Sequence, residues 1–114
     1  MEPKARTTII TTQSELDAAL HSLADQATLA IDTEFERVHQ YHPALSLVQI
    51  ASAEEAFAID MLSPLNFSNL KALLADPSKL KILHSARQDL EALYFGLGTV
   101  VQNIFDTQVG AMFC

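Results

Sequence analysis

Stretches in which apolar or β-branched residues alternate with polar ones recur along the whole chain and predict short strands. Clusters of turn-forming residues separate these stretches, as expected where strands end. The predicted strands cover residues 7–11, 29–34, 45–51, 56–59, 80–84 and 104–105.

Between these strands, apolar residues recur at spacings of three and four, which predicts amphipathic helices. Ser14 is a favourable N-cap for the first helix, and Pro77 ends the second because proline cannot continue a helix. Gly96 and Gly98 are expected to close the third helix. The predicted helices cover residues 16–24, 67–76 and 86–97, and a fourth begins at residue 107.

The predicted elements follow the order strand, helix, three strands, and then helix and strand in alternation. The tight connection at residues 52–55 predicts an antiparallel hairpin. Strands that are separated by helices become parallel neighbours in a sheet. We therefore expect an α/β fold in which a mixed β-sheet is flanked by helices.

The composition is that of one compact domain: 114 residues, 49% of them hydrophobic and 18% charged. No apolar run is long enough to cross a membrane. The single cysteine, Cys114, rules out a disulfide within this chain, so we expect a cytoplasmic protein.

Fourteen acidic residues against seven basic ones give a formal charge of −7. This charge disfavours a general nucleic-acid-binding surface, because such surfaces are rich in Lys and Arg. It does not disfavour a metal-dependent phosphodiesterase, whose site is itself a carboxylate cluster and whose cation supplies the positive charge.

Two carboxylates interrupt the apolar strand at residues 29–34. Side chains alternate between the two faces of a strand, so Asp32 and Glu34 share one face while Ile31 and Thr33 share the other. The two acids then lie about 6.6–7 Å apart along the strand, close enough to converge on one hydrated divalent cation. A strand that runs out into a charged turn explains the same pattern, and only the rest of the chain decides between the two.

Further carboxylates lie near the ends of other predicted elements. Asp60 follows a strand and precedes a turn, so we expect it to cap that turn. Asp89 and Glu91 border opposite flanks of the apolar stripe of their helix, and periodicity does not choose which of them reaches the sheet. Asp106 stands between a strand and a helix, where an N-cap is the plainest role.

Taken together, these segments resemble the motifs of the DEDD 3′→5′ exonucleases. Residues 31–35 (IDTEF) are similar to the first motif, residues 84–91 (HSARQDLE) to the second, and residues 105–108 (FDTQ) to the segment that follows it. Residues 41–50 resemble the hairpin of the ribonuclease D group in particular. The resemblance runs from residue 29 to residue 114 in the family's order and implies a ribonuclease H-like fold.

The resemblance implies that Asp32, Glu34 and Asp89 are three of the family's four metal-binding acids, which selects Asp89 over Glu91. Asp106 matches a family position that supports the fold. The implied cofactors are two Mg²⁺ or Mn²⁺ ions, since hard oxygen ligands favour these cations. The implied reaction is two-metal hydrolysis of phosphodiester bonds at RNA 3′ ends, with tRNA precursors as the expected substrate.

Single-stranded RNA is held by aromatic faces and basic side chains. For Phe35, Tyr41 and His42, packing in the core or a loop is the plainer role, and His84 is expected to be a hydrogen-bonded structural histidine. Arg37 and Arg87 are both candidates for contacts with phosphate groups. The candidate substrate-binding residues are Thr33, Phe35, Tyr41, His42 and Arg87.

The last predicted helix is still apolar at the final residue, so we expect an N-terminal fragment of an exonuclease domain. The third motif, with its fourth acid and its Tyr or His, and the helical domains that follow would then be missing. Such a fragment is expected to be inactive alone and to self-associate through its apolar end. The alternatives are a non-catalytic nucleic-acid- or protein-binding domain of the same fold and a DNA-directed proofreading exonuclease.

Overall fold

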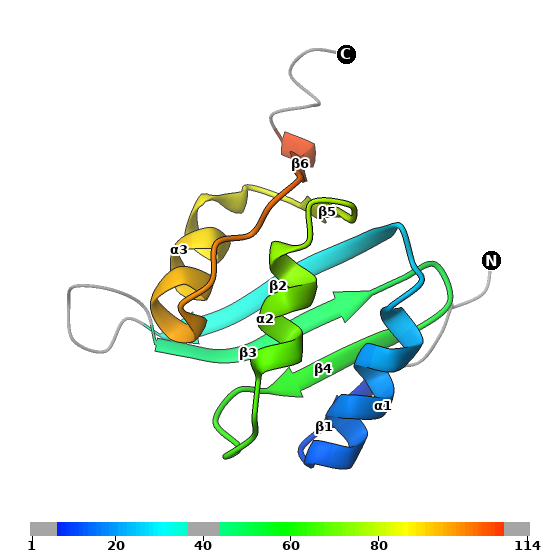
Figure 1. Ribbon diagram of the computed structural model, residues 1–114. Helices are drawn as coiled ribbons and strands as arrows, with labels where there is room; N and C mark the ends of the chain where they lie inside the picture. Colours follow the sequence, from blue (N-terminus) through cyan, green and yellow to red (C-terminus); the bar gives the residue numbers. More distant parts are fainter. Residues whose placement is uncertain (1–6, 37–43, 109–114) are drawn as a thin grey trace.

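The computed structural model describes residues 7–36 and 44–108 of the chain. Within them, a six-stranded sheet has the strand order β1-β4-β3-β2-β5-β6 (Figure 1). The strands are β1 (Thr7–Ile10), β2 (Thr28–Glu36), β3 (Ala44–Ala51), β4 (Ala56–Asp60), β5 (Leu80–Leu83) and β6 (Ile104–Asp106). Each lies within two residues of its predicted position.

The sheet is mixed, as predicted. Strand β3 pairs antiparallel with both β2 and β4, which confirms the hairpin. The pairs β1–β4, β2–β5 and β5–β6 are parallel, as expected for strands that are separated along the chain by helices or longer segments. Strand β2 therefore lies near the middle of the sheet, with an antiparallel neighbour, β3, on one side and a parallel neighbour, β5, on the other.

Three helices lie within the described residues: α1 (Gln13–Leu23), α2 (Ser68–Ala75) and α3 (Ala86–Leu97). The N-cap of α1 is Thr12 rather than the predicted Ser14, because Thr12 and Glu15 form a reciprocal capping box. Helix α2 ends at its cap Asp76, before Pro77 as predicted. Most of the predicted fourth helix falls on residues 109–114, outside the described residues.

The two glycines at the end of α3 have different roles. Gly98 is the C-cap with φ of 70°, a left-handed conformation that glycine adopts without strain, as predicted. Gly96 lies inside the helix, so the prediction that it closes α3 was wrong. A Cβ at Gly96 would come 2.6 Å from the Cβ of Leu45, so this glycine lets α3 approach β3 closely.

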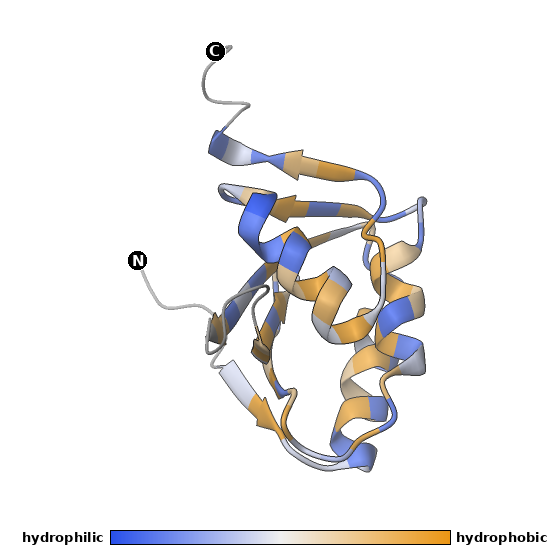
Figure 2. Cartoon of the chain, turned by 90° about the vertical axis from the view of Figure 1, so that its left-hand side faces the viewer, coloured by the Kyte–Doolittle hydropathy of each residue, from blue (hydrophilic) through white to orange (hydrophobic). Residues whose placement is uncertain are grey.

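All three helices cover the same face of the sheet (Figures 1 and 2). Their apolar stripes meet the alternate strand residues that point toward them, among which Ile31, Val48 and Ile59 are buried. The opposite face is more open in the described structure, and the alternation in β2 places Asp32 and Glu34 on it. No helix in this part of the chain is long and apolar enough to cross a membrane.

Strand β2 pairs with β5 only through Thr28, Leu29 and Ala30. Beyond Ala30 the two strands are no longer paired in the described structure, while α3 follows β5 and packs against β2 and β3. The second half of β2, which carries both acids of the first motif, is therefore not paired with β5. The helix α3 packs against β2.

Two buried lysines, Lys79 and Lys81, lie where the chain passes from α2 into β5. The ammonium of Lys81, whose side chain is 0% exposed, donates to the carbonyl oxygens of Asp76 and Gln102, the latter at 3.0 Å. Lys79 donates in the same way to the carbonyls of Ala24 and Gln26. Burial lowers the pKa of Lys81. The two ammonium groups thus satisfy four backbone carbonyl acceptors.

Candidate active site

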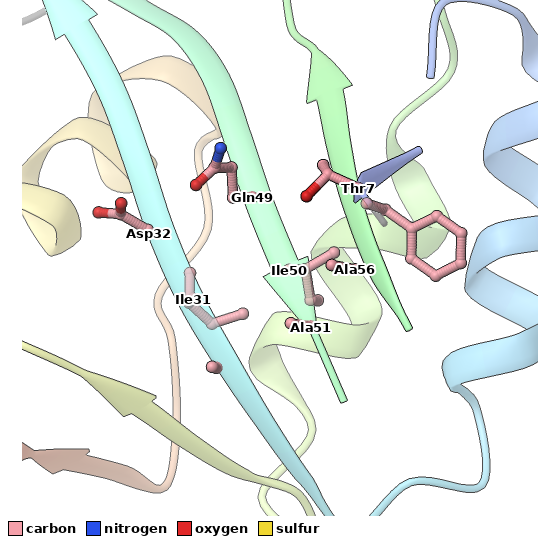
Figure 3. A pocket seen from close by; sticks show the side chains of 9 residues that line it. Thr7, Ile31, Asp32, Gln49, Ile50, Ala51 and Ala56 are labelled. Carbon is pink, nitrogen blue, oxygen red and sulfur yellow. The ribbon is translucent and has the colours of Figure 1, made fainter. Parts of the chain in front are cut away.

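The candidate site is built around the second half of β2. Thr33 is buried while Asp32 and Glu34 are exposed, so the predicted division of this strand into two faces is confirmed. The Asp32 carboxylate accepts the backbone N–H of Thr33 at 3.0 Å. Figure 3 shows that this carboxylate is directed away from Gln49, its cross-strand neighbour on β3.

Asp89, in the first turn of α3, lies on the other side of β2. Its side chain is only 8% exposed, and its Oδ1 accepts the hydroxyl of Thr33 at 2.5 Å. Glu91 is exposed. The structure therefore places Asp89, and not Glu91, against the strand of the first motif.

The electrostatics of Asp89 connect it to the other acids. Burial is the largest influence and raises the pKa of this carboxyl, whereas the hydrogen bond from Thr33 lowers it. The negative charges of Asp32 and Asp106 raise the pKa further. Asp32 and Asp89 thus interact through space, although Asp32 lies on the open face of β2 and Asp89 packs against the face that the helices cover.

The donor chemistry of Asp32, Glu34 and Asp89 fits a hard divalent cation, because all three offer carboxylate oxygens. Within residues 7–36 and 44–108, however, no three His, Cys, Asp or Glu side chains come together as a group able to hold a metal ion. A shared ligand role for these three acids therefore stays a prediction.

Asp106 fixes the position of α3. Its carboxylate accepts the backbone N–H groups of Ser85 and Ala86 at 2.9 and 2.7 Å, where α3 begins. Ser85 has a φ of 56°, so the chain turns sharply at this point. The same carboxylate accepts the N–H of Gln108 at 2.9 Å, which is the local cap that the sequence predicted.

Two other polar predictions are also confirmed. Asp60 accepts the N–H of Leu62 at 2.9 Å and the hydroxyl of Ser63 at 3.0 Å, so it caps the turn after β4. His84 forms a hydrogen bond through Nδ1 with the Thr107 hydroxyl at 2.8 Å, as expected of a structural histidine.

The candidate substrate residues are in different environments. Thr33 is buried and its hydroxyl is bonded to Asp89, while Phe35 is half-buried and packs against the core. Arg87 is exposed near the start of α3. Tyr41, His42 and Arg37 lie outside the described residues. Contact of any of them with substrate stays a prediction.

The sequence did not reveal a shallow hollow beside Asp32 on the open face. The register of the sheet brings small side chains of four strands together there, with Gln49 directly opposite Asp32 (Figure 3). Its lining includes Thr7, Ala30, Asp32, Gln49, Ala51 and Ala56. Only knowledge of the cross-strand pairing could have predicted this grouping.

A mixed sheet with an Asp-x-Glu pair on its middle strand, next to a helix with a buried aspartate, defines a nuclease-like α/β domain. The sequence model of a 3′-5′ exonuclease family matches residues 7–114, and the chain belongs to this family.

Several relatives are ribonucleases D. The protein from Gluconacetobacter diazotrophicus is 41% identical over 105 residues, which cover 91% of this chain and 27% of that protein. The protein from Escherichia coli is 39% identical over 106 residues, covering 93% of this chain and 28% of its own length. The chain thus spans less than a third of the length of these relatives.

Solved structures agree with the sequence comparison. Escherichia coli RNase D, described as an exoribonuclease involved in structured RNA processing, matches with a TM-score of 0.88 and 37% identity, over 96% of this chain and 29% of that one. Trypanosoma brucei RNase D in complex with RNA matches with a TM-score of 0.83 and 28% identity, over 93% of this chain and 39% of that one. These matches confirm the predicted fold.

Proposed function

We propose that the chain provides the first two acidic motifs of a 3′→5′ exoribonuclease of the ribonuclease D type, which hydrolyses phosphodiester bonds at RNA 3′ ends. The observation that carries the proposal is the pair Asp32 and Asp89, held on either side of β2 and both hydrogen-bonded to Thr33. Burial and the charge of Asp32 both raise the pKa of Asp89, and acids perturbed in this way are frequent at functional sites.

Asp32, Glu34 and Asp89 would hold the divalent cations, Mg²⁺ or Mn²⁺ by their donor chemistry. When bound, such cations supply Lewis-acid stabilisation of the charge that develops on the phosphate and lower the pKa of water. The chain's own contribution is positional. Exposed Asp32 and Glu34 project from a strand whose other face is buried, and Asp89 is fixed by α3 and Thr33.

RNA is the proposed substrate because the relatives are ribonucleases and one matched structure contains RNA. Arg87, exposed at the start of α3, is the proposed phosphate contact within the described residues. Processing of tRNA 3′ ends in the cytoplasm is the finer proposal. It rests on the family resemblance and on the single cysteine, which favours a reducing compartment.

The test uses the full-length protein and a 5′-labelled single-stranded RNA, with Mg²⁺ or Mn²⁺ present. We expect a ladder of products shortened from the 3′ end, and no shortening when the 3′-hydroxyl is replaced by a phosphate. The same sequence as DNA tests the proofreading alternative, since faster shortening of DNA would contradict the RNA assignment. Binding of RNA without any shortening would favour a non-catalytic domain.

A further inference from the structure

Thr33 contacts the carboxylates of both Asp32 and Asp89. Its backbone N–H donates to Oδ1 of Asp32 at 3.0 Å, and its side-chain hydroxyl donates to Oδ1 of Asp89 at 2.5 Å. The two acids are 57 positions apart along the chain and lie on different elements. One residue of β2 therefore fixes an oxygen of each.

We propose that Thr33 is a positioning residue that sets the Asp89 carboxylate relative to Asp32 through these two hydrogen bonds. This inference rests on the proposed exonuclease function. It also gives Thr33 a role other than the substrate contact predicted from the sequence.

The surroundings of Thr33 make its hydroxyl a rigid donor. The residue is 7% exposed, on the face of β2 that packs against the helices, and its cross-strand partner Val48 is fully buried. A β-branched side chain in such a place has few accessible χ1 rotamers. The Thr33 hydroxyl donates, because an ionised carboxylate can only accept.

The fold does not depend on Thr33 to hold α3 in place. Asp106 anchors the first residues of this helix through the N–H groups of Ser85 and Ala86, and Leu93 on the same helix is fully buried in the core. Loss of the Thr33 hydroxyl should therefore leave the helix where it is and release only the Asp89 carboxylate. Such a change lowers the rate of a reaction that needs fixed acids more than it affects folding.

The test compares Thr33→Val and Thr33→Ser in the full-length protein. Valine keeps the β-branched shape and removes the hydroxyl, whereas serine restores a hydroxyl. Thr99→Val is the matched control, because Thr99 is also buried, at 6% exposure, but lies in the loop after α3. We expect Thr33→Val to lower kcat about 10- to 100-fold with KM for RNA changed less than about twofold, and Thr33→Ser to recover most of the loss.

A second comparison separates positioning from general stability. In the Asp89→Ala background, Thr33→Val should change kcat by less than about twofold, because no side-chain oxygen is left at position 89 for Thr33 to position. An equal loss in both backgrounds, or a loss no greater than that of Thr99→Val, would overturn the proposal. If Thr33→Val does not fold, Thr33→Ala takes its place, and its kcat is compared with the same variants in the same two backgrounds.

Mn²⁺ affinity, measured by calorimetry without RNA, separates this inference from the proposed function. If the wild-type protein is inactive, this result contradicts the exonuclease assignment but not the positioning role of Thr33. In that case, weaker Mn²⁺ binding in Thr33→Val than in Thr99→Val would still support positioning by Thr33. Equal Mn²⁺ affinity in these two variants and wild type would overturn it.

Discussion

The carboxylate of Asp106, at the end of β6, holds the backbone N–H of Ala86 at 2.7 Å. This hydrogen bond spans 20 residues and ties the last described strand to the first turn of α3, three residues before Asp89. The neighbouring N–H of Ser85 and the N–H of Gln108 are bonded to the same carboxylate. The position of the second acidic motif thus depends on a residue outside that motif.

Replacing Asp106 with Ala should lower the free energy of unfolding by about 1–3 kcal/mol, because three backbone donors lose a charged acceptor. Urea unfolding at neutral pH measures this loss. Asp60→Ala is a suitable comparison, since Asp60 caps only a surface turn and should cost less. A loss for Asp106→Ala no larger than for Asp60→Ala would contradict the role in anchoring α3.

Asp89→Asn should make the folded protein more stable at neutral pH while lowering activity. Burial raises the pKa of Asp89 in the folded state, so that state binds the proton more tightly than the unfolded chain, whose Asp pKa is about 3.9. The contribution of Asp89 to stability is therefore complete below about pH 4 and is lost as the pH rises through the raised folded pKa. Asparagine does not ionise and still accepts from Thr33.

Urea unfolding of wild type and Asp89→Asn between pH 3 and 7 tests this prediction. The difference in unfolding free energy should be near zero at the acidic end and should increasingly favour Asp89→Asn toward neutral pH. A difference that does not change with pH would show that ionisation of Asp89 is not coupled to folding.

Lys81→Met should destabilise the protein by about 1–3 kcal/mol, because the carbonyls of Asp76 and Gln102 lose their buried donor. Methionine has a similar length, so little of the packing volume is lost. The matched control is Lys71→Met on the exposed side of α2, which should change stability by less than about 0.5 kcal/mol. Thermal unfolding of both variants at one pH makes the comparison.

The 114-residue chain by itself should shorten RNA far more slowly than the full-length protein. The chain spans less than a third of the length of its ribonuclease D relatives, and a site with fewer carboxylates holds a hydrated cation less tightly. Parallel assays at equal concentration, with Mg²⁺ and Mn²⁺, measure the ratio. Equal rates would show that Asp32, Glu34 and Asp89 suffice.

Much of the fold could be predicted because local patterns of apolar and polar residues determine its strands and helices. Alternation in β2 separated Asp32 and Glu34 from Ile31 and Thr33, and the structure has that division. The N-cap of α1 was misplaced because Ser14 and Thr12 are both good caps, and only the reciprocal bond with Glu15 selects Thr12.

The contacts that organise the candidate site could not be predicted, because they join distant residues. The hydrogen bond from Thr33 to Asp89 spans 56 positions, and no periodicity shows it. The burial of Lys81 in the middle of a strand is likewise decided by carbonyls from two other segments. Choosing Asp89 over Glu91 required the family resemblance, since both flank the same apolar stripe.

The most direct test of the account is the exonuclease rate of Asp32→Asn and Glu34→Gln in the full-length protein, measured together with thermal stability. Both side chains are exposed on the open face of β2, so neutral isosteres should leave the melting temperature within a few degrees of wild type. Glu54→Gln, an exposed acid in the turn after β3, controls for loss of charge. We expect both β2 variants to lose 3′→5′ shortening of RNA and Glu54→Gln to keep it. Near-wild-type rates in either β2 variant, with the fold intact, would contradict this expectation.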